Sequence, residues 1–309
     1  MTLAQRHLPL RREIPCDFVS SVVNMENGGP SRTALVTAYA RAYHQIVDQP
    51  QIFTDPLAAR LLGHEVEELP RLGTAATDRL GGAVTDRPRR LFFASRARFA
   101  EDAVAAAVAA GVRQVVILGA GLDTFAYRNP RRDLRVFEVD HPATQAWKRE
   151  RLAANGIDSP DTLTFVPVDF ETQALATELE AAGFSRTDPA VFVWLGVVYY
   201  LTPDAAHATL AYIAGQVQPV EVVFDYLRSA TTDAERAHQR ARADRLAAVG
   251  EPVFSYFTPD GIAAQLRVLG FTDVEDHSAP DLIAGYLGGS AEFEVSPALY
   301  AIHMLRASR

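Results

Sequence analysis

A pair of glycines followed by acidic residues marks the part of this chain that could do chemistry. Residues 115–124 read VVILGAGLDT. The apolar, largely β-branched start predicts a buried strand, and Gly119 and Gly121 carry no Cβ, so the turn can approach a ligand closely. A second strand over 134–140 ends in Asp140, about 20 residues after Gly119, where an acid can bond a ribose. The pattern predicts binding of a nucleoside-containing cofactor.

The residues around this turn favour one cofactor over another. A dinucleotide site needs a third glycine where this chain has Thr124. The carboxylate of Asp123 would repel a pyrophosphate but could accept hydrogen bonds from an ammonium group. A third strand over 163–169 ends in Asp169, which suits the exocyclic amine of an adenine. Acids after successive strands therefore favour S-adenosylmethionine, which is cationic and has no phosphate, over NAD.

Composition narrows the class of protein and the kind of partner. The chain has 309 residues, 48% of them hydrophobic, which is enough for a full α/β core. A net charge of −8 argues against nucleic acid and anionic membranes, so we expect a small-molecule substrate. The single cysteine, Cys16, excludes an internal disulfide and a cysteine-based metal site. We find no metal-ligand spacing, signal peptide or membrane-length apolar run, and expect a cytoplasmic protein without a metal.

The elements that must position these residues follow from periodicity and from helix caps. We expect a helical lead-in with helices starting near Ser31, at Asp55 and at Arg89, the last ending at Gly111. Strand–helix alternation begins at Val115 and predicts a doubly wound parallel sheet. The further expected segments are a loosely ordered arm at 1–30, a mobile loop at 70–88, strands at 191–195 and 220–225, helices from Thr202 and Thr258, a charged helix at 229–250 that forms part of a lid, and an antiparallel edge pair at 272–275 and 297–305.

Several of these motifs together resemble the leucine carboxyl methyltransferase family. The matching segments are GAGLDT at 119–124 with Arg128, FEVDHP at 137–142 and PVDF at 167–170. The resemblance runs from about Ser31 to the C-terminus. It implies a class I methyltransferase fold, α/β and Rossmann-like, with a seven-stranded, mostly parallel sheet, an antiparallel edge strand, N-terminal helices and a helical lid. It also implies a single domain over 1–309, with an arm and helical cap at 1–110, a core at 111–309 and a helical insertion at about 229–256.

The family's cofactor contacts carry over to matching positions of this chain. The resemblance implies that Gly119, in the turn with Gly121, lines the methionine moiety, that Asp140 holds the ribose hydroxyls, and that Asp169 with the backbone of Phe170 contacts the adenine. Arginine in the helix before the first strand anchors the cofactor carboxylate in the family. We assign this role to Arg96, with Arg98 as the alternative, because a planar bidentate donor matches a carboxylate.

One segment departs from the family pattern. Many members have a Glu-Gly pair after the fourth strand, and that glutamate helps to bind the cofactor, whereas this chain has Leu195-Gly196. The family's cofactor-binding carboxylate is therefore absent from this position. The tyrosines that follow, Tyr199 and Tyr200, suggest a more apolar substrate entrance.

For several other side chains, both a functional and a structural interpretation are open. Asp123 could bind the cofactor's amino group or cap the next helix, and Glu138 could be a second ligand or a salt-bridge partner. The candidates for catalysis are Tyr199, Tyr200, Tyr43 and His44, although packing explains each of them as well. We interpret His207, His238, His277 and His303 as structural or exposed.

The reaction that we expect is methyl transfer to an oxygen of a small molecule. A carboxylate acceptor is already ionised at neutral pH, so the enzyme mainly orients and desolvates it. A phenol or alcohol would need a general base. No residue stands out as that base, which favours a carboxylate or an acidic hydroxyl. The alternatives are an NAD-dependent oxidoreductase and a homologue that binds the cofactor without catalysis.

Overall fold

The computed structural model describes residues 31–309 except 66–68, 70–85, 170–172, 249 and 290–297. The arm expected at 1–30, most of the loop expected at 70–88, and Phe170 lie outside the described residues. Within the described ranges, no helix combines the length and the apolar character needed to cross a bilayer.

A seven-stranded sheet forms the centre of the molecule, in the order β3-β2-β1-β4-β5-β7-β6. The first five strands pair in parallel, and β7 runs antiparallel to both of its neighbours. This confirms the predicted fold class. The strand order reverses between β1 and β4, which is where open α/β sheets bind ligands. The strands are β1 Gln114–Leu118, β2 Arg135–Asp140, β3 Leu163–Pro167, β4 Ala190–Trp194, β5 Val220–Leu227, β6 Asp273–Ser278 and β7 Ile302–Ser308.

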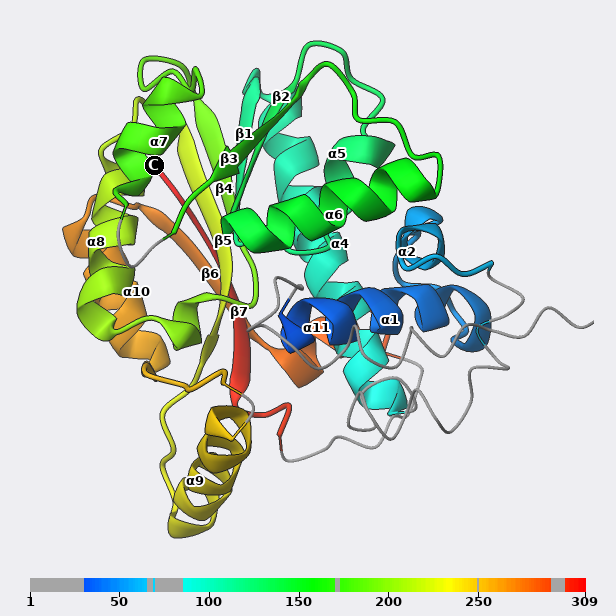
Figure 1. Cartoon of the computed structure of the whole chain (residues 1–309). Coiled ribbons are helices and arrows are strands. Elements are labelled where there is room, and N and C mark those ends of the chain that lie inside the picture. Colours follow the sequence, from blue (N-terminus) through cyan, green and yellow to red (C-terminus); the bar gives the residue numbers. More distant parts are fainter. Residues whose placement is uncertain (1–30, 66–68, 70–85, 170–172, 249, 290–297) are drawn as a thin grey trace, which may run out of the picture.

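Helices cover both faces of the sheet (Figure 1). Helices α7, α8 and α10 lie on one side, and α4, α5, α6 and α11 lie on the other, with α1 and α2 beside them. Threonine caps start two helices as predicted, because Thr202 and Thr258 each accept a backbone N–H of the first turn. The helices are α1 Arg32–Val47, α2 Leu57–Leu61, α4 Arg87–Ala109, α5 Phe125–Arg128, α6 Pro142–Ala154, α7 Leu175–Ala181, α8 Pro203–Ala214, α9 Asp233–Ala247, α10 Pro259–Val268 and α11 Ala279–Tyr286, with a 3-10 turn at Val198–Tyr200.

The last two strands pair as predicted, but their bounds and positions differ. Residues 299–301 form a turn, so the final strand begins at Ile302 and runs to Ser308 rather than over 297–305. It lies one place in from the edge, between β5 and the edge strand β6. Helix α11, which we did not predict, follows β6 directly, and the Ser278 side chain caps it.

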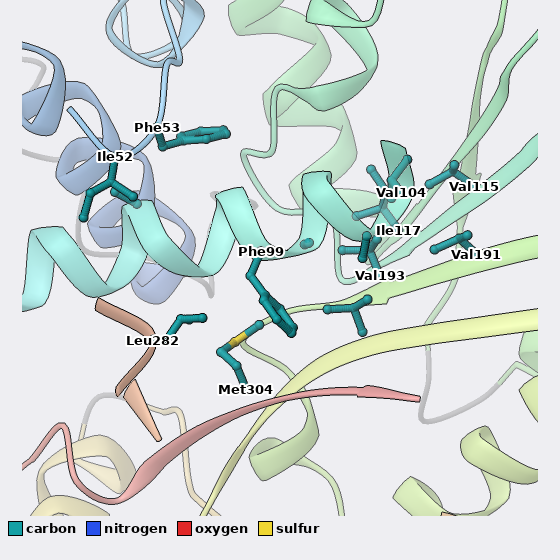
Figure 2. Close-up of a cluster of buried hydrophobic side chains, with 14 of the residues drawn as sticks. Ile52, Phe53, Phe99, Val104, Val115, Ile117, Val191, Val193, Leu282 and Met304 are labelled. Carbon is teal, nitrogen blue, oxygen red and sulfur yellow. The ribbon is translucent and has the colours of Figure 1, made fainter. Parts of the chain in front are cut away.

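Alternating side chains divide the core into two layers, one on each face of the sheet. Val116 and Phe192 pack with α8 and α10, whereas Val115 and Val193 pack with α4. Figure 2 shows Phe99 projecting from α4 toward Met304 of β7 and Val193 of β4. This packing holds α4, the helix that carries Arg89 and Arg96.

Helix α9, within the predicted insertion, differs from the others in its surroundings. Figure 1 shows that it stands apart from the sheet and its covering helices. None of its residues is buried. A capping box between Thr232 and Glu235 stabilises its first turn, so the helix depends on local rather than core contacts.

Candidate active site

A cavity of about 510 Å³ opens at the carboxyl ends of β1, β2 and β4, and we call it the glycine cavity. Helix α1 covers it through Thr33, Ala34, Thr37 and Arg41. Its volume lies in the range typical of small-molecule sites. The other lining residues come from the ends of the strands, from α4 and α6 and from the segment after α9: Phe93, Arg96, Ala97, Ile117, residues 119–123, Asp140, His141, Thr144, residues 195–197, Tyr200, residues 250–252 and Phe254; Ser31 precedes α1.

Both glycines of the turn after β1 need the conformation that glycine allows. Gly119 and Gly121 have φ values of +65° and +49°. A Cβ at Gly119 would overlap the Cγ2 atom of Val197, and one at Gly121 would lie 3.2 Å from the Cβ of Ala34. The backbone can therefore form the cavity wall at a place where a larger residue would fill it.

Asp140 lines the same cavity and also holds the turn. Its Oδ2 accepts the Gly121 N–H at 2.5 Å, and its Oδ1 accepts the His141 N–H at 2.7 Å. Burial raises the pKa of this carboxyl group, and these two backbone donors partly oppose that rise. Each carboxylate oxygen keeps lone-pair capacity for a further donor, which fits a ribose diol.

The other two predicted acids differ in their placement. Asp123 lines the glycine cavity, and its Oδ1 accepts the Phe125 N–H at 2.7 Å, so it caps α5 at the cavity wall. Asp169 follows β3, and its amide donates to Gln173 Oε1 at 2.9 Å. The structure does not bring Asp169 into the described lining of the glycine cavity, because β3 lies one strand beyond β2. Its adenine contact stays a prediction.

Arg96 lies where the cofactor's carboxylate anchor was expected, and Arg98 does not. The Arg96 side chain is buried and lines the glycine cavity. Its Nη1 donates to Asp225 Oδ2 at 3.0 Å. Arg98 instead donates to the Ile52 carbonyl and lies over the Tyr286 ring, outside the described cavity linings. The geometry favours Arg96 over the alternative.

Asp225 provides a carboxylate in the corner where the family glutamate is absent. Leu195 lines the cavity there. From the neighbouring strand, Asp225 Oδ1 accepts the Gly196 N–H at 2.5 Å, while its other oxygen pairs with Arg96. Our sequence analysis missed this residue. The signal was present, since Asp225 ends an apolar run, as Asp140 does.

A second cavity of about 340 Å³ adjoins the first, and we call it the arginine cavity. The two cavities share five lining residues: Thr33, Phe93, Arg96, Tyr200 and Glu251. Of the residues described, five arginines line the second cavity, against the two carboxylates of Asp225 and Glu251. The arginines are Arg32, Arg89, Arg96, Arg242 and Arg245. In a chain of net charge −8, this cavity is locally basic.

A hydrogen-bonded group lies in the wall between the cavities. The Tyr200 hydroxyl lies 3.0 Å from Thr33 Oγ1 and donates to Glu251 Oε2 at 3.3 Å. Thr33 also donates to Glu251 through both its hydroxyl and its amide. Burial raises the pKa of Tyr200, and it raises that of the neighbouring Tyr199 to about 12. Both phenols are therefore protonated at neutral pH and can act as hydrogen-bond donors.

The structure does not bring Tyr43 and His44, two of the candidate catalytic residues, into the described lining of either cavity. Tyr43 donates its hydroxyl to the Leu69 carbonyl at 2.5 Å, in the core beneath α1. His44 is fully buried; its Nε2 accepts the Ile52 N–H at 2.9 Å, so Nδ1 carries the proton and faces Asp48 at 3.1 Å. Neither residue lines the glycine or the arginine cavity, because both point to the side of α1 that packs on the core.

The structure also places two side chains whose roles the sequence left open. Glu138 is buried and pairs with Lys148 Nζ at 2.7 Å, so it is a salt-bridge partner rather than a cavity ligand. His238 of α9, interpreted from the sequence as structural or exposed, lines the arginine cavity. Its buried Nε2 finds no hydrogen-bond partner within the described part of the chain.

This fold and cavity define a class of protein. A seven-stranded sheet in this order, with β7 antiparallel and a glycine turn after β1, is the class I methyltransferase fold. A crystal structure titled as a putative methyltransferase from Thermobifida fusca YX matches 87% of this chain and 94% of its own, with a TM-score of 0.53 and 18% identity. At that identity, the match supports the fold alone.

Sequence comparison shows the family. The profile described as leucine carboxyl methyltransferase matches residues 34–214, and the chain belongs to this family. The relative named "Putative S-adenosyl-L-methionine-dependent methyltransferase YktD" of Bacillus subtilis (strain 168) is 32% identical over 307 residues, covering 92% of this chain and 99% of its own. A similarly named protein of Mycobacterium sp. (strain KMS) is 34% identical over 242 residues, 74% of this chain and 75% of its own. The chain is an S-adenosylmethionine-dependent methyltransferase, and the NAD alternative is set aside.

Proposed function

We propose that this protein transfers a methyl group from S-adenosylmethionine to a carboxylate oxygen of a small molecule. The observation that carries the proposal is the basic cavity that shares a wall with the glycine cavity. Bound S-adenosylmethionine supplies a sulfonium-activated methyl group. An acceptor in the arginine cavity would face it across Thr33, Arg96 and Tyr200.

The glycine cavity is the better fit for the cofactor. Its glycine turn leaves room at the backbone, and Asp140 offers acceptor capacity for two hydroxyls. Arg96 is held in place by Asp225 and keeps other N–H groups for the methionine carboxylate. We assign cofactor contacts to Arg96, Gly119, Gly121, Asp123 and Asp140.

The proposed chemistry needs orientation more than proton transfer. A carboxylate is ionised at neutral pH and needs no base. Tyr199 and Tyr200 hold their own protons, and Glu251 already accepts bonds from Thr33 and Tyr200. The phenols can donate hydrogen bonds, and Glu251 helps to shape the cavity.

A second candidate reaction rests on His238. Its Nε2 lies buried and without a partner in the described part of the arginine cavity. For an acidic hydroxyl acceptor, this nitrogen could take the proton as a general base. His238→Gln separates the two reactions, with His207→Gln, an exposed histidine of α8, as the matched control.

The test is formation of S-adenosylhomocysteine on incubation with a panel of carboxylic acids and phenols. We expect turnover with acids, a product methyl group that is released by mild base as an ester should be, and a kcat in H238Q close to that of H207Q. Turnover with phenols alone, and a loss of about 10²- to 10⁴-fold in H238Q, would instead assign the hydroxyl reaction. Cofactor binding without turnover on any acceptor would support the non-catalytic alternative.

A further inference from the structure

Three arginines in the arginine cavity have few anionic partners among the residues that the structure describes. Arg89 lies on α4, and Arg242 and Arg245 lie on α9, so elements about 150 residues apart bring them to one cavity. In the described part of the chain, the ion pair of Arg89 is with Asp86 at 3.9 Å. Neither Arg242 nor Arg245 has a carboxylate within ion-pair distance among the described residues.

The three charges are close enough to repel one another. Burial lowers the pKa of Arg89, and the positive charges of Arg242 and Arg245 lower it further, against the opposing effect of Asp86. Like charges gathered with few counterions are unfavourable. An anion bound between them would relieve this repulsion, and Arg guanidinium groups match the planar geometry of carboxylate and phosphate.

Apolar side chains also line the arginine cavity. Phe92 and Phe93 of α4, Leu246 of α9 and Leu299 and Ile302 near β7 line it. Thr33 and Tyr200 line both this cavity and the glycine cavity. The lining of the cavity therefore combines polar groups shared with the glycine cavity, apolar side chains and the basic cluster.

We propose that Arg89, Arg242 and Arg245 bind a second anionic group of the methyl acceptor, remote from the methylated oxygen. The acceptor is then a small molecule with an apolar body and two acidic ends, the distal one a carboxylate or a phosphate ester. This inference rests on the proposed function for the identity of the reacting end. The anion-binding part of the inference does not depend on the proposed reaction, because binding to the cluster can be measured without turnover.

Helix α9 gives the binding a structural consequence. Since α9 has no buried residue, its position over the cavity depends on few packing contacts. An anion shared between Arg89 of α4 and Arg242 of α9 would tie the helix to the body of the protein. Binding of a diacid should therefore protect α9 amides from hydrogen exchange, and a monoacid should not.

Matched probes isolate the distal group. We would use phenylacetate and its para-substituted carboxylate, phosphate-ester and carboxamide derivatives, and the same end groups on a ten-carbon fatty acid. Calorimetry in saturating S-adenosylhomocysteine measures affinity, and S-adenosylhomocysteine formation from S-adenosylmethionine measures turnover. In at least one series, we expect the probe with a distal carboxylate or phosphate to bind about 10- to 100-fold more tightly than the probes whose distal end is uncharged. The tighter-binding of these two end groups identifies the distal group of the acceptor.

Single variants assign that preference to the cluster. Arg89→Gln, Arg242→Gln and Arg245→Gln should each reduce the diacid preference about 10-fold and leave S-adenosylmethionine affinity unchanged. The matched control is Arg240→Gln, an exposed arginine of α9 outside the described cavity linings. A control variant that loses the preference as much as R242Q does would overturn the proposal.

The outcomes separate this inference from the proposed function. Equal affinity for diacids and monoacids, with turnover of both, overturns the second anion site and leaves the carboxylate reaction standing. Preferential diacid binding that the cluster variants abolish, without turnover, supports the anion site and counts against the proposed reaction. Absence of both binding and turnover in the two series counts against both.

Discussion

Removal of the Asp140 carboxylate should weaken cofactor binding and should also destabilise the fold by a somewhat smaller amount. In the proposed complex, this side chain accepts the ribose hydroxyls, and charge-assisted bonds in a half-buried site are worth about 1.5–3 kcal/mol. Asp140→Ala should therefore raise the Kd for S-adenosylmethionine about 10- to 150-fold. Calorimetric titration of the folded variant measures this directly.

The structure adds a stability cost that the sequence did not show. Asp140 also accepts the Gly121 and His141 amides, so its loss leaves two backbone donors to solvent. Since the side chain is half-buried and water can reach this edge, we expect a cost of about 1–2 kcal/mol, or a few degrees in Tm without ligand. Asp158→Ala, the same change at an exposed position before β3, is the control and should alter neither quantity.

A pH series tests the charge of Asp140 separately from its shape. Burial raises the pKa of this acid, so protonation begins at a higher pH than for an exposed aspartate. Wild-type affinity should fall as the pH drops through that raised pKa, because the protonated acid is a poorer acceptor, whereas D140A should show no such fall. Unchanged cofactor affinity in folded D140A at neutral pH would refute the placement of the cofactor in the glycine cavity.

Three other predictions follow from geometry elsewhere in the protein. Gly119→Ala should lose at least about 10-fold in cofactor affinity, because its φ is +65° and its new Cβ overlaps Val197; adding Val197→Ala should restore part of this in the same titration. Asp225→Asn should lower kcat/KM about 10-fold, because it loosens the paired side chain of Arg96. As a control in the core, His44→Ala should lower Tm and leave kcat/KM per folded molecule unchanged. Asp48→Asn should destabilise the protein by about 3–5 kcal/mol at pH 7. Burial opposes ionisation of Asp48, but hydrogen bonds from His44 and Arg90 outweigh it and lower its pKa. The difference in unfolding free energy between the wild type and D48N, measured by urea unfolding, should therefore shrink as the pH falls below about 4.

The sheet could be predicted because its signals are local. Runs of β-branched and aromatic residues such as 115–118 and 220–224 bury both faces of parallel strands, and the threonine caps at Thr202 and Thr258 form bonds within one helical turn. The glycine turn could also be predicted from the sequence, because a backbone with positive φ strongly favours glycine. The start of the last strand was misplaced because residues 299–301 are apolar enough to continue a strand yet form a turn.

The candidate site was only partly predictable. Gly119, Gly121, Asp123 and Asp140 lie next to the strand ends that identify them, and the structure brings them to one cavity. The family resemblance pointed to Arg96, but its partner Asp225 is 129 residues away, and no spacing rule links them. The choice between Arg96 and Arg98 depended on how α4 is rotated against the sheet.

The sequence alone determined the class of fold, the glycine turn and the acid that faces it, because each depends on backbone conformation and near neighbours. Only the tertiary structure decided which side of α1 is core and which is cavity, and so removed Tyr43 and His44 from the site while adding Thr33. It also brought Arg89 and Arg242 to one wall. Helical periodicity places residues on a face, but the neighbour that covers that face depends on the packing of the whole chain.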